Sequence, residues 1–234
     1  MQQNRLRPVY GCRLGALARH VGKVVGYQIP VFLRLPKRMA LEQLKLLASP
    51  LHVSGVVPMF HIPGITPEAP SLEAATGGER LEKIQVDMKD VKAAYDEITT
   101  AGDDKPDMVC IGCPHLTYAE IREIAEYLEG KRVHLDVKLW VGTSYQIRVV
   151  ANRAGWTGKI ESGRPSGDQH LHGPRKSCAY TRSKSNCNEL SKVCVLCPGV
   201  KVFFSTRDCL EAAISGRWRG DDVHNIEVEG LSQG

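Results

Sequence analysis

The chain has 234 residues, which is enough for one sizeable hydrophobic core or two small ones. Hydrophobic residues make up 42% and charged residues 24%, the balance of a soluble globular protein. The N-terminus carries no apolar signal-peptide segment, and no later stretch reaches the apolar length of a membrane span. The sequence therefore predicts a cytoplasmic protein with no membrane partner.

The formal net charge of +5 is concentrated in one basic stretch, residues 164–198. This stretch holds six Lys or Arg and two Asp or Glu, which leaves 25 basic against 24 acidic residues elsewhere. A nucleic-acid-binding protein carries its basic face on a folded helix or strand, whereas this stretch has no apolar periodicity. The pattern predicts no nucleic-acid partner, and binding through the basic stretch stays open as an alternative.

Eight cysteines without a secretory signal favour metal binding, catalysis or plain burial over a disulfide framework. Two C-x-x-C pairs occur, Cys110 with Cys113 and Cys194 with Cys197. They lie more than eighty residues apart, far beyond the spacing of a zinc ribbon, and Cys110 falls in an apolar run that predicts a place in the core. A zinc-binding interaction module is the second alternative.

The first part of the chain predicts helices and short strands. Residues 1–14 show no pattern and are expected to be irregular. Apolar residues at helical spacing predict a helix over residues 15–26 and another over 40–47, and residues 29–32 suit a short strand.

Residues 53–62 are apolar and predict a buried strand that runs into a loop rich in proline, residues 63–70. Because Pro58 lies inside this run, either the edge of the strand is free or the strand begins after Pro58. A stiff loop after a strand can aim polar side chains at a ligand. His61, Thr66 and Glu68 are the candidates, and a rigid surface connection is the alternative reading of this loop.

From residue 83 the pattern alternates between strand and helix. Residues 83–86 predict a strand, and Asp87 can cap a helix to about residue 100. Residues 108–111 predict a buried strand, and Thr117 with Glu120 has the spacing of a capping box for a helix over residues 118–129.

Cys113 and His115 lie between that strand and that helix, so the sequence predicts them in a turn at the carboxyl end of the strand. In open α/β sheets ligands bind at this end, and helix-start N–H groups favour a thiolate there. The alternative is that Cys113 is a small half-buried residue and His115 a loop hydrogen-bonder.

The last predicted elements also alternate between strand and helix. Residues 137–141 and 200–204 predict strands, followed by helices to about residue 154 and over 206–215. Strands that alternate with helices of this length imply parallel pairing and an α/β fold built from parallel βα units.

Three stretches in this order resemble the catalytic domain of the aconitase X family: MFHIPGITPEA at residues 59–69, IGCPHLTYAE at 111–120 and CLEAAISGRW at 209–218. The resemblance implies a partial aconitase-like catalytic domain over residues 15–218 and a C-terminal tail over 219–234. It implies a hydro-lyase that uses iron or an iron–sulfur cluster, a small hydroxy acid substrate such as mevalonate 5-phosphate or cis-3-hydroxy-L-proline, and a separate small (swivel) subunit.

The resemblance also implies roles for single residues. Cys113 is expected to be a metal ligand. The residues expected near the reacting atoms are His61, His115 and Ser144, and those expected to bind substrate are Thr66 and Glu68.

The sequence departs from the family in two places. The N-terminal Cys-Thr-Pro ligand motif of the family is absent here, and Cys12 does not lie in such a motif. Between residues 164 and 198 an Asp-Thr-Cys ligand motif and an Asn-Ser-Ala-Lys motif are also missing. An inactive fragment of such an enzyme is therefore an alternative reading of this chain.

The missing motifs of the basic stretch reappear in another reading frame. Residues 166–173 can be encoded by AGT GGT GAC CAA CAC TTG CAT GGT, which read one base later gives Val-Val-Thr-Asn-Thr-Cys-Met-Val. Residues 188–197 likewise give Thr-Asn-Ser-Ala-Lys-Tyr-Ala-Tyr-Tyr. The hypothesis is therefore that residues 164–198 are out of frame, and they are expected to be irregular.

Overall fold

The computed structural model describes residues 8–98, 105–163, 185–188, 200–203 and 205–218. The chain divides into two compact units. We call Arg13–Tyr95, grouped with Asn225–Gly234, the helical unit, and Asp96–His224, grouped with Met1–Cys12, the sheet unit.

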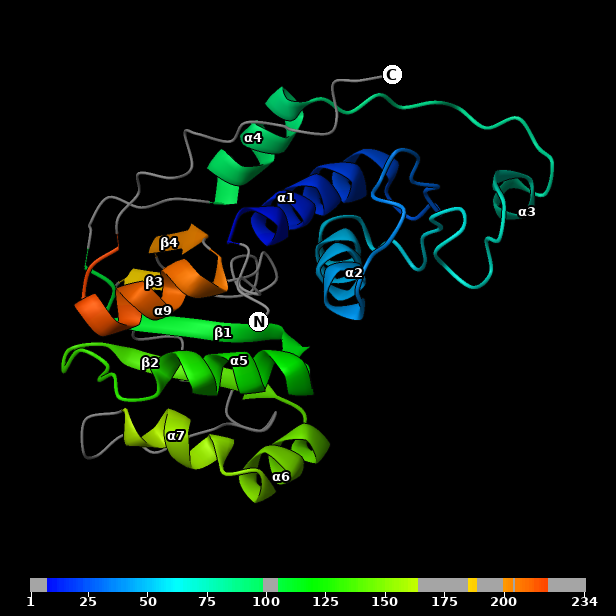
Figure 1. Ribbon diagram of the computed structural model, residues 1–234. Helices are drawn as coiled ribbons and strands as arrows, with labels where there is room; N and C mark the ends of the chain where they lie inside the picture. The colour runs from blue at the N-terminus through cyan, green and yellow to red at the C-terminus, as the bar shows by residue number, and fades with distance from the viewer. Residues whose placement is uncertain (1–7, 99–104, 164–184, 189–199, 204, 219–234) are drawn as a thin grey trace. The chain divides into compact units, whose positions relative to one another are not determined.

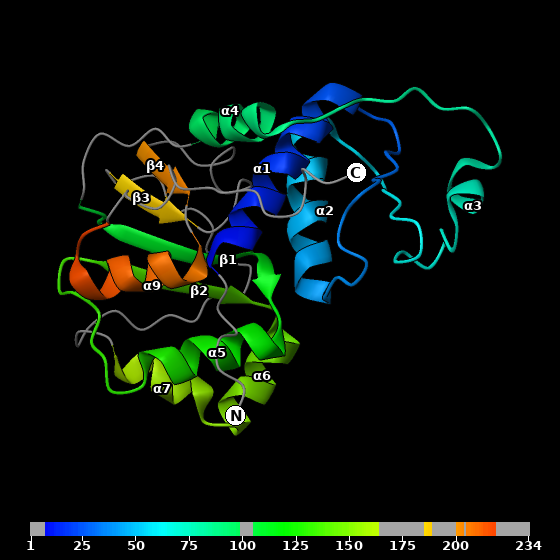
Figure 2. The same ribbon diagram turned by 45° about the horizontal axis from the view of Figure 1, so that its top comes forward.

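The helical unit contains α1 (Pro8–Val25), α2 (Leu41–Gly55), α3 (Leu72–Thr76) and α4 (Met88–Ile98), of which α1 and α4 cross the unit boundaries. α1 begins seven residues before the predicted start. α1 and α2 lie side by side (Figures 1 and 2), and their backbones come close at Gly22 and Gly55. Bare glycine at both positions is what allows this approach.

The strand predicted over residues 53–62 is wrong. Its first three residues continue α2, and residues 56–60 have no regular structure. Leu47, Pro50 and Leu51 are the buried residues of α2, so tertiary burial of this helix outweighs the local preference of β-branched residues for a strand. The strand predicted over residues 83–86 is also absent.

The start of α4 matches its prediction. The Asp87 carboxylate accepts hydrogen bonds from the backbone N–H groups of Lys89 at 2.7 Å and Asp90 at 3.2 Å. The predicted face of α4 is buried at Val91, Ala94 and Tyr95.

In the described part of the sheet unit, four strands form one sheet in the order β2-β1-β3-β4, with every pairing parallel. The strands are β1 (Met108–Leu116), β2 (Lys138–Thr143), β3 (Ser185–Asn188) and β4 (Val200–Phe203). Parallel strands joined through helices confirm the predicted α/β fold.

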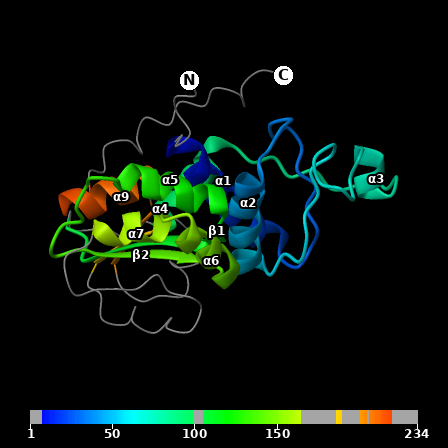
Figure 3. The same cartoon turned by 60° about the horizontal axis from the view of Figure 1, so that its bottom comes forward.

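The helices of the sheet unit are α5 (Tyr118–Leu128), α6 (Tyr145–Arg153), α7 (Trp156–Ser162) and α9 (Thr206–Ser215). α5 and α9 lie on the same face of the sheet, and α6 and α7 lie next to α5 (Figures 1 and 3). Val109 and Ile111 of β1 are buried in the core that these helices share with the sheet. The predicted capping box of α5 is present: Thr117 Oγ1 accepts from Glu120 N at 3.3 Å, and Glu120 Oε2 accepts from Thr117 N at 2.7 Å.

The basic stretch is not irregular throughout, because Ser185–Asn188 forms β3 between β1 and β4. For these four residues the expectation of irregular structure is wrong. Residues 164–184 and 189–199, with Cys194 and Cys197, lie outside the described ranges. No helix in the described ranges is both long and apolar enough to cross a membrane.

Candidate functional site

The carboxyl end of β1 forms an arch where its pairing with β2 is interrupted. Ile111 pairs with Val141, and the next pair is Leu116 with Thr143. β1 therefore uses four residues, 112–115, where β2 uses only Gly142. We call residues 112–115 the arch. A bulge of this kind moves the extra residues out of the ladder.

Two glycines allow the arch to begin. Gly112 has φ +114°, and a Cβ there would meet the backbone of Gly142, with Gly142 N only 2.7 Å away. A Cβ on Gly142 would in turn lie 3.0 Å from Gly112 O. The peptide bond between Cys113 and Pro114 is cis.

The arch carries both candidate residues of this region. Cys113 is partly buried, and His115 is exposed. The prediction placed them in a turn after the strand, whereas the structure places them in an irregular part of β1 itself. Their location at the carboxyl end of the strand is as predicted.

Ser144 follows β2 directly and is the N-cap of α6. Its Oγ accepts a hydrogen bond from Ile147 N at 3.3 Å, so the hydroxyl has a structural role that the sequence analysis did not assign. Because β1 and β2 are parallel neighbours, Ser144 lies at the same sheet edge as the arch. The structure therefore brings Cys113, His115 and Ser144 to one edge.

His61 lies in the helical unit, where it forms an isolated parallel bridge with Val31. Phe32 N donates to His61 O at 2.8 Å, and His61 N donates to Pro30 O at 3.0 Å. These two bonds fix the backbone of His61. Its Nδ1 atom is buried without a hydrogen-bond partner, a state that is uncommon for a ring nitrogen.

The loop after His61 is held by its own backbone and by Thr66. Gly64 N donates to Ala69 O at 2.8 Å, and Thr66 Oγ1 accepts from Ile62 N at 3.0 Å. The Thr66 hydroxyl therefore closes the turn, and Glu68 is exposed. His61, Thr66 and Glu68 belong to the helical unit, while the arch and Ser144 belong to the sheet unit.

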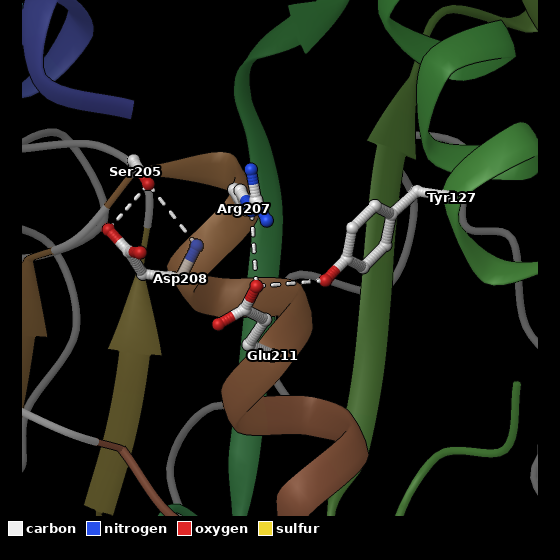
Figure 4. Close-up of polar contacts among 5 residues, drawn as sticks. All are labelled: Tyr127, Ser205, Arg207, Asp208 and Glu211. Atoms are coloured by element: carbon white, nitrogen blue, oxygen red, sulfur yellow. Dashed lines mark hydrogen bonds and ion pairs between the residues drawn. The ribbon is translucent and has the colours of Figure 1, made fainter. Parts of the chain in front are cut away.

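One polar cluster that the sequence analysis missed joins α5 to α9 (Figure 4). Glu211 Oε1 accepts hydrogen bonds from Tyr127 Oη and Arg207 Nε, each at 3.1 Å. At the start of α9, Ser205 Oγ accepts from Asp208 N at 3.2 Å and donates to the Asp208 carboxylate. The spacing of Arg207 and Glu211 is a local signal for their ion pair, whereas nothing local indicates Tyr127.

Burial, and then the hydrogen bond to Glu211, raises the pKa of Tyr127 above its usual value. The folded state therefore holds the phenol proton more tightly than the unfolded state. The protonated Tyr127 side chain therefore contributes fully to stability below pH 10, the pKa of tyrosine in the unfolded chain. This contribution is lost as the pH rises through the pKa of Tyr127 in the folded protein.

We expect Tyr127→Phe to lower the free energy of unfolding by about 0.5 kcal/mol near neutral pH, because it removes one exposed hydrogen bond. The difference between the two proteins should shrink above pH 10. Urea unfolding of both proteins between pH 8 and 11 measures it. A difference that stays constant over this range would contradict the link between Tyr127 and Glu211.

The described residues contain no group of three or more His, Cys, Asp or Glu side chains that could hold a metal ion. Cys110 is only partly buried and lies outside the core cluster, so its predicted place in the core is wrong. The partner pair of the zinc alternative, Cys194 and Cys197, cannot be placed because it lies outside the described ranges.

Comparison with known proteins gives one consistent family. The model of the aconitase X second domain matches residues 6–96, and the model of the aconitase X third domain matches residues 106–167. The boundary between the two matches falls beside the boundary between the two structural units.

Known dehydratases are similar to this chain over much of its length. The phosphomevalonate dehydratase large subunit of Methanothermobacter thermautotrophicus is 37% identical over 170 residues, which cover 69% of this chain and 41% of that protein. The corresponding subunit of Methanocaldococcus jannaschii is 37% identical over 148 residues, 63% of this chain and 36% of that protein. The cis-3-hydroxy-L-proline dehydratase of Pseudomonas aeruginosa is 34% identical over 122 residues, 52% of this chain and 21% of that protein.

A solved structure agrees with these sequences. The holo-form of Thermococcus kodakaraensis aconitase X superposes with a TM-score of 0.63 and 29% identity, over 79% of this chain and 46% of that chain. The chain spans less than half the length of each of these relatives. The comparisons do not favour the zinc module or the nucleic-acid binder. Two successive domain models, two groups of dehydratases and a solved structure agree, so the chain belongs to the aconitase X family.

Proposed function

We propose that this chain contributes part of the active site of a hydro-lyase that removes water from a small hydroxy acid. The observation that carries the proposal is the similarity to phosphomevalonate dehydratases and cis-3-hydroxy-L-proline dehydratases across both units. Mevalonate 5-phosphate and cis-3-hydroxy-L-proline are the two candidate substrates.

The proposed roles follow the motifs shared with the family. His115, His61 and Ser144 are proposed to act near the reacting atoms, and Thr66 and Glu68 to contact substrate. Dehydration needs a base to remove a proton and an acid to assist the departing hydroxyl, and an imidazole can do either near neutral pH. The exposed ring of His115 and the unpartnered Nδ1 of His61 are compatible with proton transfer.

An iron–sulfur centre or iron is proposed as the cofactor by family membership, with Cys113 as one thiolate ligand. Clusters of this type are held by several thiolates, and within the described ranges no set of three or more donors is gathered. The described residues alone therefore do not fit the complete centre.

Two of the missing motifs are expected within the basic stretch, residues 164–198. We propose that residues 164–198 derive from a one-base change of reading frame and that the intended frame encodes a Thr-Cys motif and an Asn-Ser-Ala-Lys motif. The match to the third-domain model ends at residue 167, close to the start of this stretch.

The partner is proposed to be a separate small subunit. The relatives from Methanothermobacter thermautotrophicus and Methanocaldococcus jannaschii are named as large subunits. The name implies a smaller companion chain, and assays of this protein should include it.

Sequencing the transcript and assaying the protein that it encodes test the function. We expect the message to carry the shifted frame. With iron, sulfide and the small subunit supplied under argon, its product should dehydrate one of the two candidate substrates. Cys113→Ser should lower the iron content and abolish turnover, whereas Cys110→Ser, three residues earlier in β1, should retain both.

Two outcomes would count against these proposals. A message that encodes residues 164–198 as printed would remove the reading-frame hypothesis. A folded, iron-loaded protein that dehydrates neither substrate would contradict the proposed hydro-lyase activity.

A further inference from the structure

Thr143 joins the ends of the two strands that carry the candidate site. Its side chain is buried, with 3% of its surface exposed. Its Oγ1 donates a hydrogen bond to Leu116 O at 2.7 Å. Thr143 and Leu116 also pair in the β1–β2 ladder, so this bond is made at the first register position beyond the arch.

The position of this bond relates it to two helix starts. Leu116 precedes Thr117, the N-cap of α5, and Thr143 precedes Ser144, the N-cap of α6. The hydrogen bond of the Thr143 hydroxyl therefore links the residue before the α6 N-cap to the backbone before the α5 N-cap. It fixes the carboxyl end of β1 relative to Ser144.

Both ends of the arch contact β2. At its start, the backbone of Gly112 lies against that of Gly142. At its finish, Leu116 is held by the ladder and by the Thr143 hydroxyl. Between the pairs Ile111–Val141 and Leu116–Thr143, the four residues of the arch lie opposite the single residue Gly142 of β2.

We infer that Thr143 is a positioning residue that holds Cys113 and His115 of the arch in place beside Ser144. The significance of those three residues rests on the proposed function, whereas the hydrogen bond that positions them does not. Valine has the shape of threonine without the hydroxyl, and serine keeps the hydroxyl without the methyl group. The two replacements therefore separate the hydrogen bond from packing.

The test is the rate at which iodoacetamide alkylates each cysteine of the folded full-length chain, resolved by peptide mass spectrometry. Cys113 reports the arch, Cys110 reports the regular part of β1, and the fully buried Cys209 of α9 reports general loosening. We expect Thr143→Val to raise the alkylation rate of Cys113 about five-fold, which corresponds to the free energy of one lost hydrogen bond. The rates of Cys110 and Cys209 should stay the same, and Thr143→Ser should leave all three near wild type.

Three results would overturn the inference. In folded Thr143→Val the Cys113 rate could stay unchanged, or the Cys209 rate could rise with it, which would indicate a general packing role. If Thr143→Val does not fold, Thr143→Ser decides, because an altered Cys113 rate there would show that the hydroxyl is not the determinant. Alkylation needs no turnover, so absence of dehydratase activity leaves this test interpretable.

Discussion

Gly112→Ala is expected to lower the free energy of unfolding of the sheet unit by at least about 3 kcal/mol, or to prevent the unit from folding. Gly112 has φ +114°, and a Cβ there would meet the backbone of Gly142. Backbone atoms cannot move aside as a flexible side chain can, so β1 and β2 would have to separate where the arch begins. Because Val109 and Ile111 of the core directly precede this point, the damage should spread into the core.

Urea unfolding followed by tryptophan fluorescence measures this effect, because Trp140, Trp156 and Trp218 all belong to the sheet unit. Gly130→Ala is the matched control in the same unit. Gly130 also has positive φ, +74°, but no atom lies within 4 Å of the place where its Cβ would be. It should cost about 1 kcal/mol, the price of the backbone conformation alone. Equal losses in the two variants would show that the close approach to Gly142 contributes nothing.

The elements that the sequence predicted well are those that begin with a local signal. The capping box of Thr117 and Glu120 and the cap of Asp87 each involve residues three or fewer positions apart. The partners of such contacts can be read directly from the local sequence. For this reason the starts of α4 and α5 agree with their predictions, and α9 agrees over its full length.

The failures depend on contacts between distant residues. The strand predicted over residues 53–62 rests on an apolar run rich in valine, yet its first three residues complete α2, whose preceding turns are buried at Leu47, Pro50 and Leu51. Residues 83–86 resemble a strand but have none beside them among the described elements. A strand needs a partner, and a short apolar run does not reveal whether one exists.

The candidate site shows the same division. The place of Cys113, His115 and Ser144 at the carboxyl ends of parallel strands was predictable, and their roles stay predictions. The arch was not predictable, because it exists only through the pairing of β1 with β2 and the close approach of Gly112 to Gly142, thirty positions later. The role of Thr143 has the same origin, since its acceptor, Leu116 O, lies twenty-seven positions earlier in the chain.

In the helical unit, Gly55→Ala is expected to cost about 3 kcal/mol or more, because α1 and α2 touch through their backbones. A Cβ on Gly55 would meet Gly22 O and would lie 3.0 Å from Gly22 Cα. α1 would have to move away from α2 along its last turns. Thermal unfolding followed by far-UV circular dichroism, which is dominated by helices, should show a clear fall in the melting temperature.

Gly158→Ala separates this effect from helix propensity. Gly158 lies inside α7, and no atom occurs within 4 Å of its added Cβ. Alanine should therefore be neutral there or stabilise by up to about 1 kcal/mol, because it is the better helix former. The two exchanges are chemically identical and both are made in helices, so opposite signs would assign the loss at Gly55 to its contact with Gly22. An unchanged melting temperature in Gly55→Ala would mean that the two helices do not meet at these glycines.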